Sequence, residues 1–85
     1  MDVATGPQLR AARNGLGWSI EYLSECSNVS VRTIIRYEDA EGVPPNRSGN
    51  LAALIATLEI AGIEFIGTPD DGPGIRIRAP KTSGD

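Results

Sequence analysis

Residues that interrupt regular structure recur along this chain, and their spacing limits its possible folds more than any other feature. Gly15 and Gly17 follow one segment of helical periodicity, Asn28 separates two more, and Gly62 follows a fourth. A loop rich in glycine and proline, residues 39–50, separates the third segment from the fourth. The pattern predicts several short helices, which in a chain of 85 residues must share one small core.

Four helices are expected, and residues suited to capping or burial mark each of them. The first three follow a hydroxyl side chain, with expected spans of 6–14 after Thr5, 20–26 after Ser19 and 31–38 after Ser30. The fourth begins within residues 47–50 and ends at Gly62. Its apolar residues recur at helical spacing: Leu51, Leu54, Ile55 and Leu58.

The periodicity changes after Gly62, where two short runs have a period of two. Residues 63–66 and 75–78 are β-type runs, and residues 68–74 hold the turn formers that separate them. Strands this short are barely stable alone, so they must pack on the helices or pair with a second copy. We expect a mainly α fold of four to five helices with a short C-terminal β-hairpin or dimerisation strand.

The residue types present exclude several classes of chemistry. The chain has no histidine and a single cysteine, Cys26, which excludes a Cys/His zinc site, an intrachain disulfide and any His-based catalytic triad. We expect Cys26 to be a half-buried helix residue, and we expect neither an enzyme nor a bound metal or cofactor. The lone cysteine and the lack of a long apolar run or leader pattern favour a cytoplasmic protein without membrane contact.

Charge is unevenly distributed along the sequence. Residues 1–37 hold four arginines and three acidic residues, residues 38–71 hold seven acidic residues and one arginine, and residues 72–85 are net basic. The overall charge of −3 therefore hides a cationic N-terminal half, which is the expected contact surface if the protein binds DNA. Near the C-terminus, the expected roles are a solvated strand face or auxiliary phosphate contacts for Arg76, Arg78 and Lys81.

The second and third helices form the most informative pattern. Two short helices joined by three or four residues, with a corner at Asn28, are typical of a helix-turn-helix. Helical spacing places Val29 and Ile34 inward, with Tyr37 partly buried. It places these residues outward: Val31, Arg32, Ile35 and Arg36. Arg32 and Arg36 then share one face and suit guanine recognition, or they form a plain exposed face by pairing with nearby acidic residues: Glu25, Glu38 or Asp39.

These residues also carry a resemblance to a known family. The run Gln8-Leu9-Arg10-Ala11-Ala12-Arg13, with Leu16-Gly17-Trp18-Ser19, Leu23, Val29-Ser30, Thr33-Ile34, Arg36 and Glu38, resembles the phage-repressor/Cro (XRE-type) helix-turn-helix family. The likeness covers residues 5–62, and residues 62–66 and 72–78 are similar to the C-terminal extension of small bacterial members. It implies a DNA-binding domain over 1–62, a β extension over 63–79 that packs on the domain or pairs in a dimer, and a flexible tail over 80–85.

The resemblance also implies a role for individual residues. Base-reading positions are Val31, Arg32 and Arg36, and the positions expected to contact phosphate are Ser30, Thr33, Arg10 and Arg13. Structural positions are Trp18, Leu23, Asn28, Val29, Ile34 and Glu38, the last expected to pair with Arg10 or Arg13. Ile20 departs from the family pattern, since a glutamine that binds phosphate usually stands there. Ser24 and Ser27 replace small apolar residues, which predicts looser packing between the two helices.

Two functions follow as hypotheses. The first is sequence-specific binding of double-stranded DNA by a transcriptional regulator, a repressor by resemblance. It would act as a homodimer formed through the C-terminal strands, the fourth helix or both. The alternative is an antitoxin-like or adaptor protein whose main partner is another protein, with the acidic middle segment and the C-terminal strand edge as contact surfaces.

Overall fold

The computed structural model describes residues 3–78 and has four α-helices followed by a two-stranded antiparallel sheet. The elements in chain order are α1 (Gly6–Gly15), α2 (Ile20–Ser27), α3 (Val31–Glu38), the 3-10 turn η1 (Arg47–Gly49), α4 (Asn50–Ile60), β1 (Ile63–Thr68) and β2 (Asp71–Ile77). The expected mainly α fold with a C-terminal hairpin is confirmed at this level. The expected tail at 80–85 and Lys81 lie outside the described residues.

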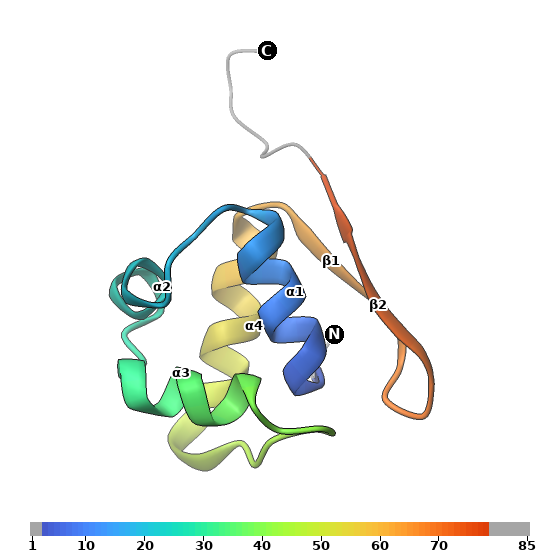
Figure 1. Ribbon diagram of the computed structural model, residues 1–85, viewed down its shortest axis with the longest axis horizontal. Coiled ribbons are helices and arrows are strands. Elements are labelled where there is room, and N and C mark those ends of the chain that lie inside the picture. The colour runs from blue at the N-terminus through green and yellow to red at the C-terminus, as the bar shows by residue number, and fades with distance from the viewer. Residues whose placement is uncertain (1–2, 79–85) are drawn as a thin grey trace.

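The helices surround α4, and the hairpin lies on the opposite side of the molecule from α2 (Figure 1). Six side chains at the centre are fully buried: Leu9, Leu23, Ile34, Leu51, Leu54 and Leu58. Because they come from all four helices, no pair of helices has a complete core without the others. Within residues 3–78, no helix is long and apolar enough to cross a membrane.

The predicted N-caps of the first three helices are confirmed. Thr5 accepts a hydrogen bond from the backbone of Gln8, whose side chain bonds back to the Thr5 backbone, so the two form a capping box. Ser19 and Ser30 each accept from the backbone N–H three residues later. Each bond satisfies a donor that helix geometry leaves unpaired, which fixes where the helix begins.

The connection between α2 and α3 turns at Asn28, as predicted, in the left-handed conformation with φ 62°. The two serines before it are tied into this turn. The Ser24 hydroxyl donates to the carbonyl of Val29 at 2.6 Å, and the Ser27 hydroxyl donates to the carbonyl of Leu23 at 2.7 Å. These hydrogen bonds explain how hydroxyl side chains are accommodated where small apolar residues were expected.

Two side chains are placed differently from the expectation. Cys26 is exposed rather than half-buried, because it lies on the outer face of α2. Tyr37 is fully buried rather than partly so, with 3% of its surface exposed. The expected structural position of Trp18 lies at the margin of the core. Its indole is half-buried and meets the Tyr22 ring edge to face, with centroids 4.8 Å apart.

The hairpin is longer and its turn tighter than expected. The strands pair from Ile63 opposite Ile77 to Thr68 opposite Asp71, so residues 71–74 belong to β2 rather than to a long connection. A side chain at Gly67, where φ is +77°, would collide with the backbone of Gly72. The Arg78 N–H donates to the Gly62 carbonyl, and along an antiparallel strand the residues that bond to the partner strand alternate with residues that do not. Position 73 therefore faces the outer edge of β2, where the pairing needs no N–H and proline is tolerated.

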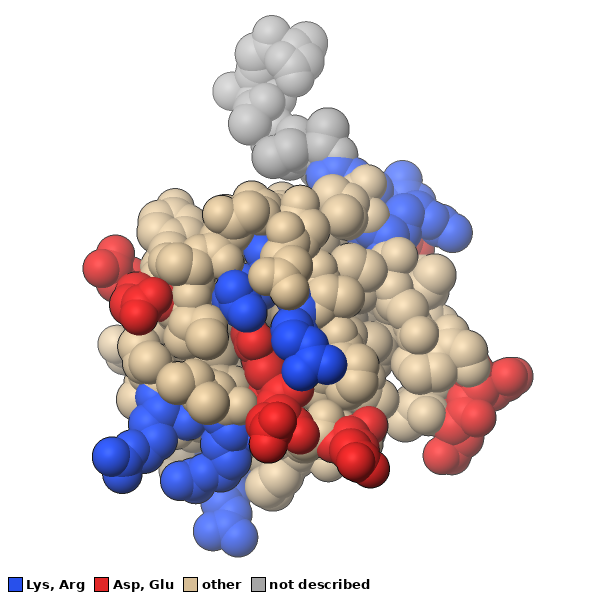
Figure 2. Space-filling view, viewed as in Figure 1, with Lys and Arg blue, Asp and Glu red and all other residues tan. Residues whose placement is uncertain are grey.

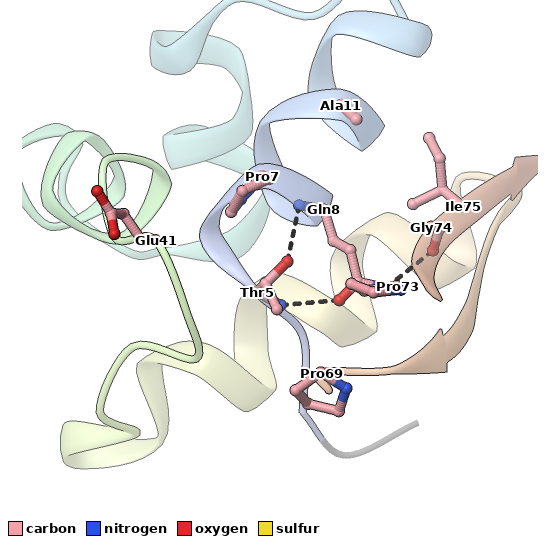
Figure 3. Close-up of a pocket in the computed structure, with 9 residues that line it drawn as sticks. All are labelled: Thr5, Pro7, Gln8, Ala11, Glu41, Pro69, Pro73, Gly74 and Ile75. Carbon is pink, nitrogen blue, oxygen red and sulfur yellow. Dashed lines mark hydrogen bonds between the residues drawn. The ribbon is translucent and has the colours of Figure 1, made fainter. Parts of the chain in front are cut away.

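The hairpin packs on its own helices, which is one of the two arrangements expected for it. The Gln8 side chain donates to the carbonyl of Gly74 at 2.8 Å (Figure 3). It also donates to the carbonyl of Ile66 at 3.2 Å, and so bridges both strands from α1. A Cβ added to Gly15 would lie 2.5 Å from the Cδ1 of Ile77, so this end of β2 lies against α1, with the flexible tip of the Ile77 side chain at the contact. Gln8 was not predicted to have this role, because its partners lie 58 and 66 residues away.

Candidate nucleic-acid interface

The outer face of α3 is polar and cationic, whereas its inner face is apolar. Ile34 and Tyr37 are buried, as is Val29 just before the helix. Arg32, Ile35 and Arg36 are exposed, as predicted, whereas Val31, which was predicted to face outward, is half-buried, and Tyr37 is more fully buried than predicted. The helix therefore presents its arginines to solvent from a backbone that the core holds rigidly.

At the N-terminal end of α3, two hydroxyls lie beside these arginines. Ser30 is exposed and its oxygen accepts from the backbone of Thr33, while its own hydroxyl donates to Thr33 Oγ1 at 2.9 Å. Because Thr33 accepts this hydrogen bond, its hydroxyl proton remains available to donate to another acceptor. Hydroxyls of this kind, together with arginines, commonly hold phosphate oxygens.

Arg32 and Arg36 have no acidic partner among residues 3–78. The expectation that they pair with Glu25, Glu38 or Asp39 is therefore wrong for this structure. In Figure 2, basic side chains gather at one edge of the face, over α3 and the start of α4, whereas acidic side chains appear over α2, over the hairpin turn and, mixed with basic ones, in the middle of the face. The two arginines sit at i and i+4, so their like charges repel mildly until an anion lies opposite them.

Arg47 joins this cationic face, although the sequence did not single it out. It is exposed, has no acidic partner within the described residues, and lines a cavity of about 230 Å³ with Arg36. The other lining residues are Thr33, Tyr37, Pro45 and Asn50. Arg47 was missed because it is the one arginine in the acidic segment 38–71, and the fold of the loop brings it beside α3.

Arg13 is held in an ion pair inside the domain. Its Nε lies 2.7 Å and its Nη2 lies 2.9 Å from the two carboxylate oxygens of Glu38, and its Nη1 donates to the carbonyl of Trp18 at 2.9 Å. The two side chains are 13% and 6% exposed. The hydrogen bond to Glu38 raises the pKa of Arg13 despite partial burial.

The phosphate role expected for Arg13 is therefore corrected to a structural one, because its guanidinium is committed to Glu38 and Trp18. Of the two partners expected for Glu38, the structure selects Arg13. Arg10 is exposed and donates to the Glu38 carbonyl at 3.2 Å. It lies at the C-terminal end of α3, about 12 Å along the helix from Ser30. The structure thus separates Arg10 from the hydroxyls at the other end of α3.

The hairpin arginines differ from those on α3 because they share a carboxylate. Arg78 Nε lies 2.7 Å and Arg76 Nη1 lies 3.2 Å from Glu64 Oε1, on the solvent-facing side of the sheet. The hydrogen bond from Arg78 is the main reason that the pKa of Glu64 falls below its ordinary value. Of the two roles expected for this pair, the geometry matches a solvated strand face.

The chemistry available on the α3 face is anion binding. Arg32, Arg36 and Arg47 supply cations, Ser30 and Thr33 supply hydroxyls, and these groups are exposed or half-buried. No group of three or more His, Cys, Asp or Glu side chains in residues 3–78 is placed to hold a metal ion. An arginine fork can bind a phosphate or the edge of a guanine with two parallel hydrogen bonds.

No protein-family model matches this chain, and no curated protein matches it either. Its function must therefore be inferred from the placement of its own side chains.

Proposed function

We propose that this protein binds double-stranded DNA in a sequence-specific way, with α2 and α3 acting as a helix-turn-helix. One observation carries the proposal. Arg32, Arg36 and Arg47, which lie on α3 and the adjacent turn, have no acidic partner in the described structure. The arginines paired with carboxylates, Arg13, Arg76 and Arg78, lie elsewhere. A cationic face on an exposed helix suits the major groove of DNA.

The proposed contacts follow from position along α3. Arg32 and Arg36 reach base edges, where arginine most often binds O6 and N7 of guanine. Val31 is half-buried at the start of the helix and can offer an apolar contact to a thymine methyl group. Ser30 and Thr33 hold the DNA backbone beside them, and backbone contacts fix the register in which the bases are read.

The acidic net charge is compatible with this proposal because acidic and basic side chains are unevenly distributed over the surface. An anionic face turned away from DNA costs little at physiological salt, since fields are screened beyond about 8 Å. Figure 2 shows acidic side chains over α2, over the hairpin turn and in the middle of the face shown, whereas the basic side chains over α3 and the start of α4 gather at one edge of that face. We expect this asymmetry to orient the protein as it approaches a duplex.

We further propose that the protein is a transcriptional regulator that acts as a homodimer. Ile60 is 83% exposed at the end of α4 and lies beside an apolar cavity of about 300 Å³ that Trp18 and Cys26 also line. An exposed side chain next to an apolar cavity suits a self-complementary contact between two copies. Two recognition helices on one face of DNA then read an inverted repeat with half-sites about 10 base pairs apart.

Selection of bound sequences from a random duplex pool tests the proposal, at about 150 mM salt so that weak phosphate attraction is screened. The expected result is an enriched inverted repeat. Arg32→Ala should then bind that repeat about 5- to 150-fold more weakly, which corresponds to 1–3 kcal/mol, and should relax one base preference. Arg76→Ala is the matched control and should leave both unchanged. A sequence preference that survives Arg32→Ala unaltered would contradict the proposed base contact.

The alternative function, an antitoxin-like or adaptor protein, is favoured by the same exposed Ile60 and its neighbouring cavity. An apolar surface of this kind also suits a different protein chain. The selection experiment separates the two proposals, because an adaptor that does not bind DNA enriches no sequence. A protein of both kinds enriches a sequence and also binds a partner, in which case Arg32→Ala weakens only the DNA binding.

A further inference from the structure

We propose that the cavity between α3 and the start of α4 is a binding site for a dianionic phosphoryl group. We further propose that a small phosphomonoester bound there competes with DNA. Arg36 and Arg47, which stand before and at the end of the loop that joins the two helices, both line this cavity of about 230 Å³. The binding step stands independently of the function proposed above, whereas the competition rests on it.

The cavity is positively charged. Arg36 and Arg47 are unpaired within residues 3–78, so the cavity carries two positive charges with no internal counterion. A phosphodiester of DNA carries one negative charge, whereas a phosphomonoester carries nearly two at neutral pH. The cavity therefore matches the charge of a terminal phosphoryl group better than that of a backbone phosphate.

Neutral hydrogen-bond donors also line the cavity. The Thr33 hydroxyl accepts a hydrogen bond from Ser30, so its own proton is free to donate. The Asn50 side chain also lines the cavity, and its amide makes no hydrogen bond with the described residues. Two guanidiniums, one hydroxyl and one amide together supply enough donors for the three terminal oxygens of a phosphoryl group.

The backbone directly after Arg47 has an unusual conformation. Ser48 has φ 54° and Gly49 has φ 74°, so two consecutive residues adopt the left-handed conformation directly after it. A residue other than glycine is strained in such a conformation. Asn46 supports this turn, because its side-chain oxygen accepts from the backbone N–H of Leu51 and Ala52 and so caps α4. The loop is therefore held in a strained shape with Arg47 at the cavity.

The size of the cavity limits the ligand. Sites for drug-sized molecules enclose about 300–1,000 Å³, so a cavity of about 230 Å³ suits a phosphoryl group with a small attached moiety. Because Arg36 is also a proposed base-reading residue, a ligand that binds it removes it from DNA. A small phosphorylated molecule would thus release the protein from its site.

An NMR titration of the full chain tests the binding step. Inorganic phosphate at about pH 8 is the dianionic probe, and dimethyl phosphate is the monoanionic probe, at equal ionic strength. Phosphate should shift the amide signals of Thr33, Arg36 and Asn50 saturably, and dimethyl phosphate should bind at least about 10-fold more weakly. Arg47→Ala should weaken phosphate binding at least about 10-fold, whereas the exposed control Arg76→Ala should change it less than about 2-fold.

Several outcomes overturn the site. These are an absence of saturable shifts, equal weakening by Arg47→Ala and Arg76→Ala, and equal affinity for the two probes, which would make the cavity a backbone-phosphate contact. A circular dichroism spectrum of Arg47→Ala that matches the parent shows that any loss of binding is not a loss of fold.

The competition is tested with the selected DNA at a saturating phosphate concentration and with chloride of equal ionic strength as the reference. Phosphate should raise the apparent Kd for DNA more than chloride does in the parent, and no more than chloride does in Arg47→Ala. If phosphate binds the cavity but leaves DNA binding unchanged, the competition is wrong and the site stands. If no DNA is bound at all, the proposed function and the competition both fail, while the titration still decides the site.

Discussion

The face of α3 and the face of the hairpin both carry arginines, but the two regions differ in what surrounds those charges. On the hairpin, Arg76 and Arg78 share the carboxylate of Glu64, with nitrogen–oxygen distances of 3.2 and 2.7 Å. On α3, Arg32 and Arg36 have no acidic partner among the described residues. The two regions therefore differ in available positive charge far more than in the number of arginines.

Arg13 differs from both groups of arginines, because its ion pair with Glu38 lies inside the domain and stabilises the fold. Their ion pair joins α1 to the C-terminal end of α3 and is largely removed from water. The pair therefore orients the helix whose outer face carries the free arginines. The role of an arginine in this protein therefore depends on its partner and not on its position in the sequence.

The largest expected effect comes from breaking the buried pair. Glu38→Gln leaves the guanidinium of Arg13 without its counter-charge, which typically costs about 3–5 kcal/mol of the free energy of unfolding. A domain of this size is stable by only about 5–15 kcal/mol, so much of its stability should be lost. Urea denaturation followed by circular dichroism measures this change. The control Glu64→Gln, at the exposed pair, should change the midpoint little, and equal changes in both variants would contradict the distinction drawn here.

The next effect is a loss of DNA affinity without a loss of stability. Arg36→Ala should weaken binding of the selected DNA about 5- to 150-fold, since a bidentate base contact contributes about 1–3 kcal/mol. Its free energy of unfolding should change by less than about 0.5 kcal/mol, because the side chain is exposed and unpaired. Fluorescence anisotropy with labelled DNA measures the affinity, with Arg78→Ala as the hairpin counterpart. An equal loss of affinity in Arg78→Ala would show that the hairpin also contacts DNA.

A smaller effect is expected at the attachment of the hairpin to α1. Gln8→Ala removes two hydrogen bonds to strand carbonyls and one half of the capping box, which should cost about 1–2 kcal/mol. Hydrogen exchange should accelerate most for the amides of β1 and β2, because the bridge between the strands and α1 is lost. Gln8→Glu is a useful companion because it keeps the cap acceptor but loses the amide donor. Uniform acceleration across all four helices would contradict a local role.

The smallest effect is a dependence on pH at the hairpin. Because Arg78 and Arg76 lower the pKa of Glu64, the folded state favours the ionised carboxylate. This contribution to stability is present above the ordinary glutamate pKa of 4.5 and is lost as the pH falls through the lower folded value. Carbon NMR of the Glu64 carboxyl should give a midpoint below 4.5 that returns towards 4.5 in Arg78→Ala. A midpoint unaffected by Arg78→Ala would show that the hydrogen bond is not maintained in solution.

Local features of the fold were predictable from sequence because they depend on near neighbours. The caps at Thr5, Ser19 and Ser30, the left-handed corner at Asn28 and the burial of Ile34 all follow from residues within one or two helical turns. The outward position of Arg32 and Arg36 follows from the same periodicity. These predictions depended on helix geometry alone, and the packing of the core did not change the features that they concern.

The remaining features depend on residues that are distant in sequence. Packing between residues 11 to 66 positions apart in the chain sets three of them: the choice of Arg13 as the partner of Glu38, the bridge from Gln8 to the hairpin, and the position of Arg47 beside Arg36. The tight turn at residues 69–70 was missed because proline and glycine normally argue against a strand. Here one edge of β2 needs no donor at Pro73.

The salt dependence of DNA affinity tests the central distinction most directly. In binding to the selected sequence, each protein cation that neutralises a phosphate adds about 0.9 to the slope of log affinity against log salt. We predict that replacing Arg36 and Arg47 together with alanine lowers both the affinity and the slope, the slope by about one cation because Arg36 is assigned to a base edge. Replacing Arg76 and Arg78 together should leave both unchanged. Equal losses of slope in the two double variants would contradict the claim that only the α3 face offers free charge to DNA.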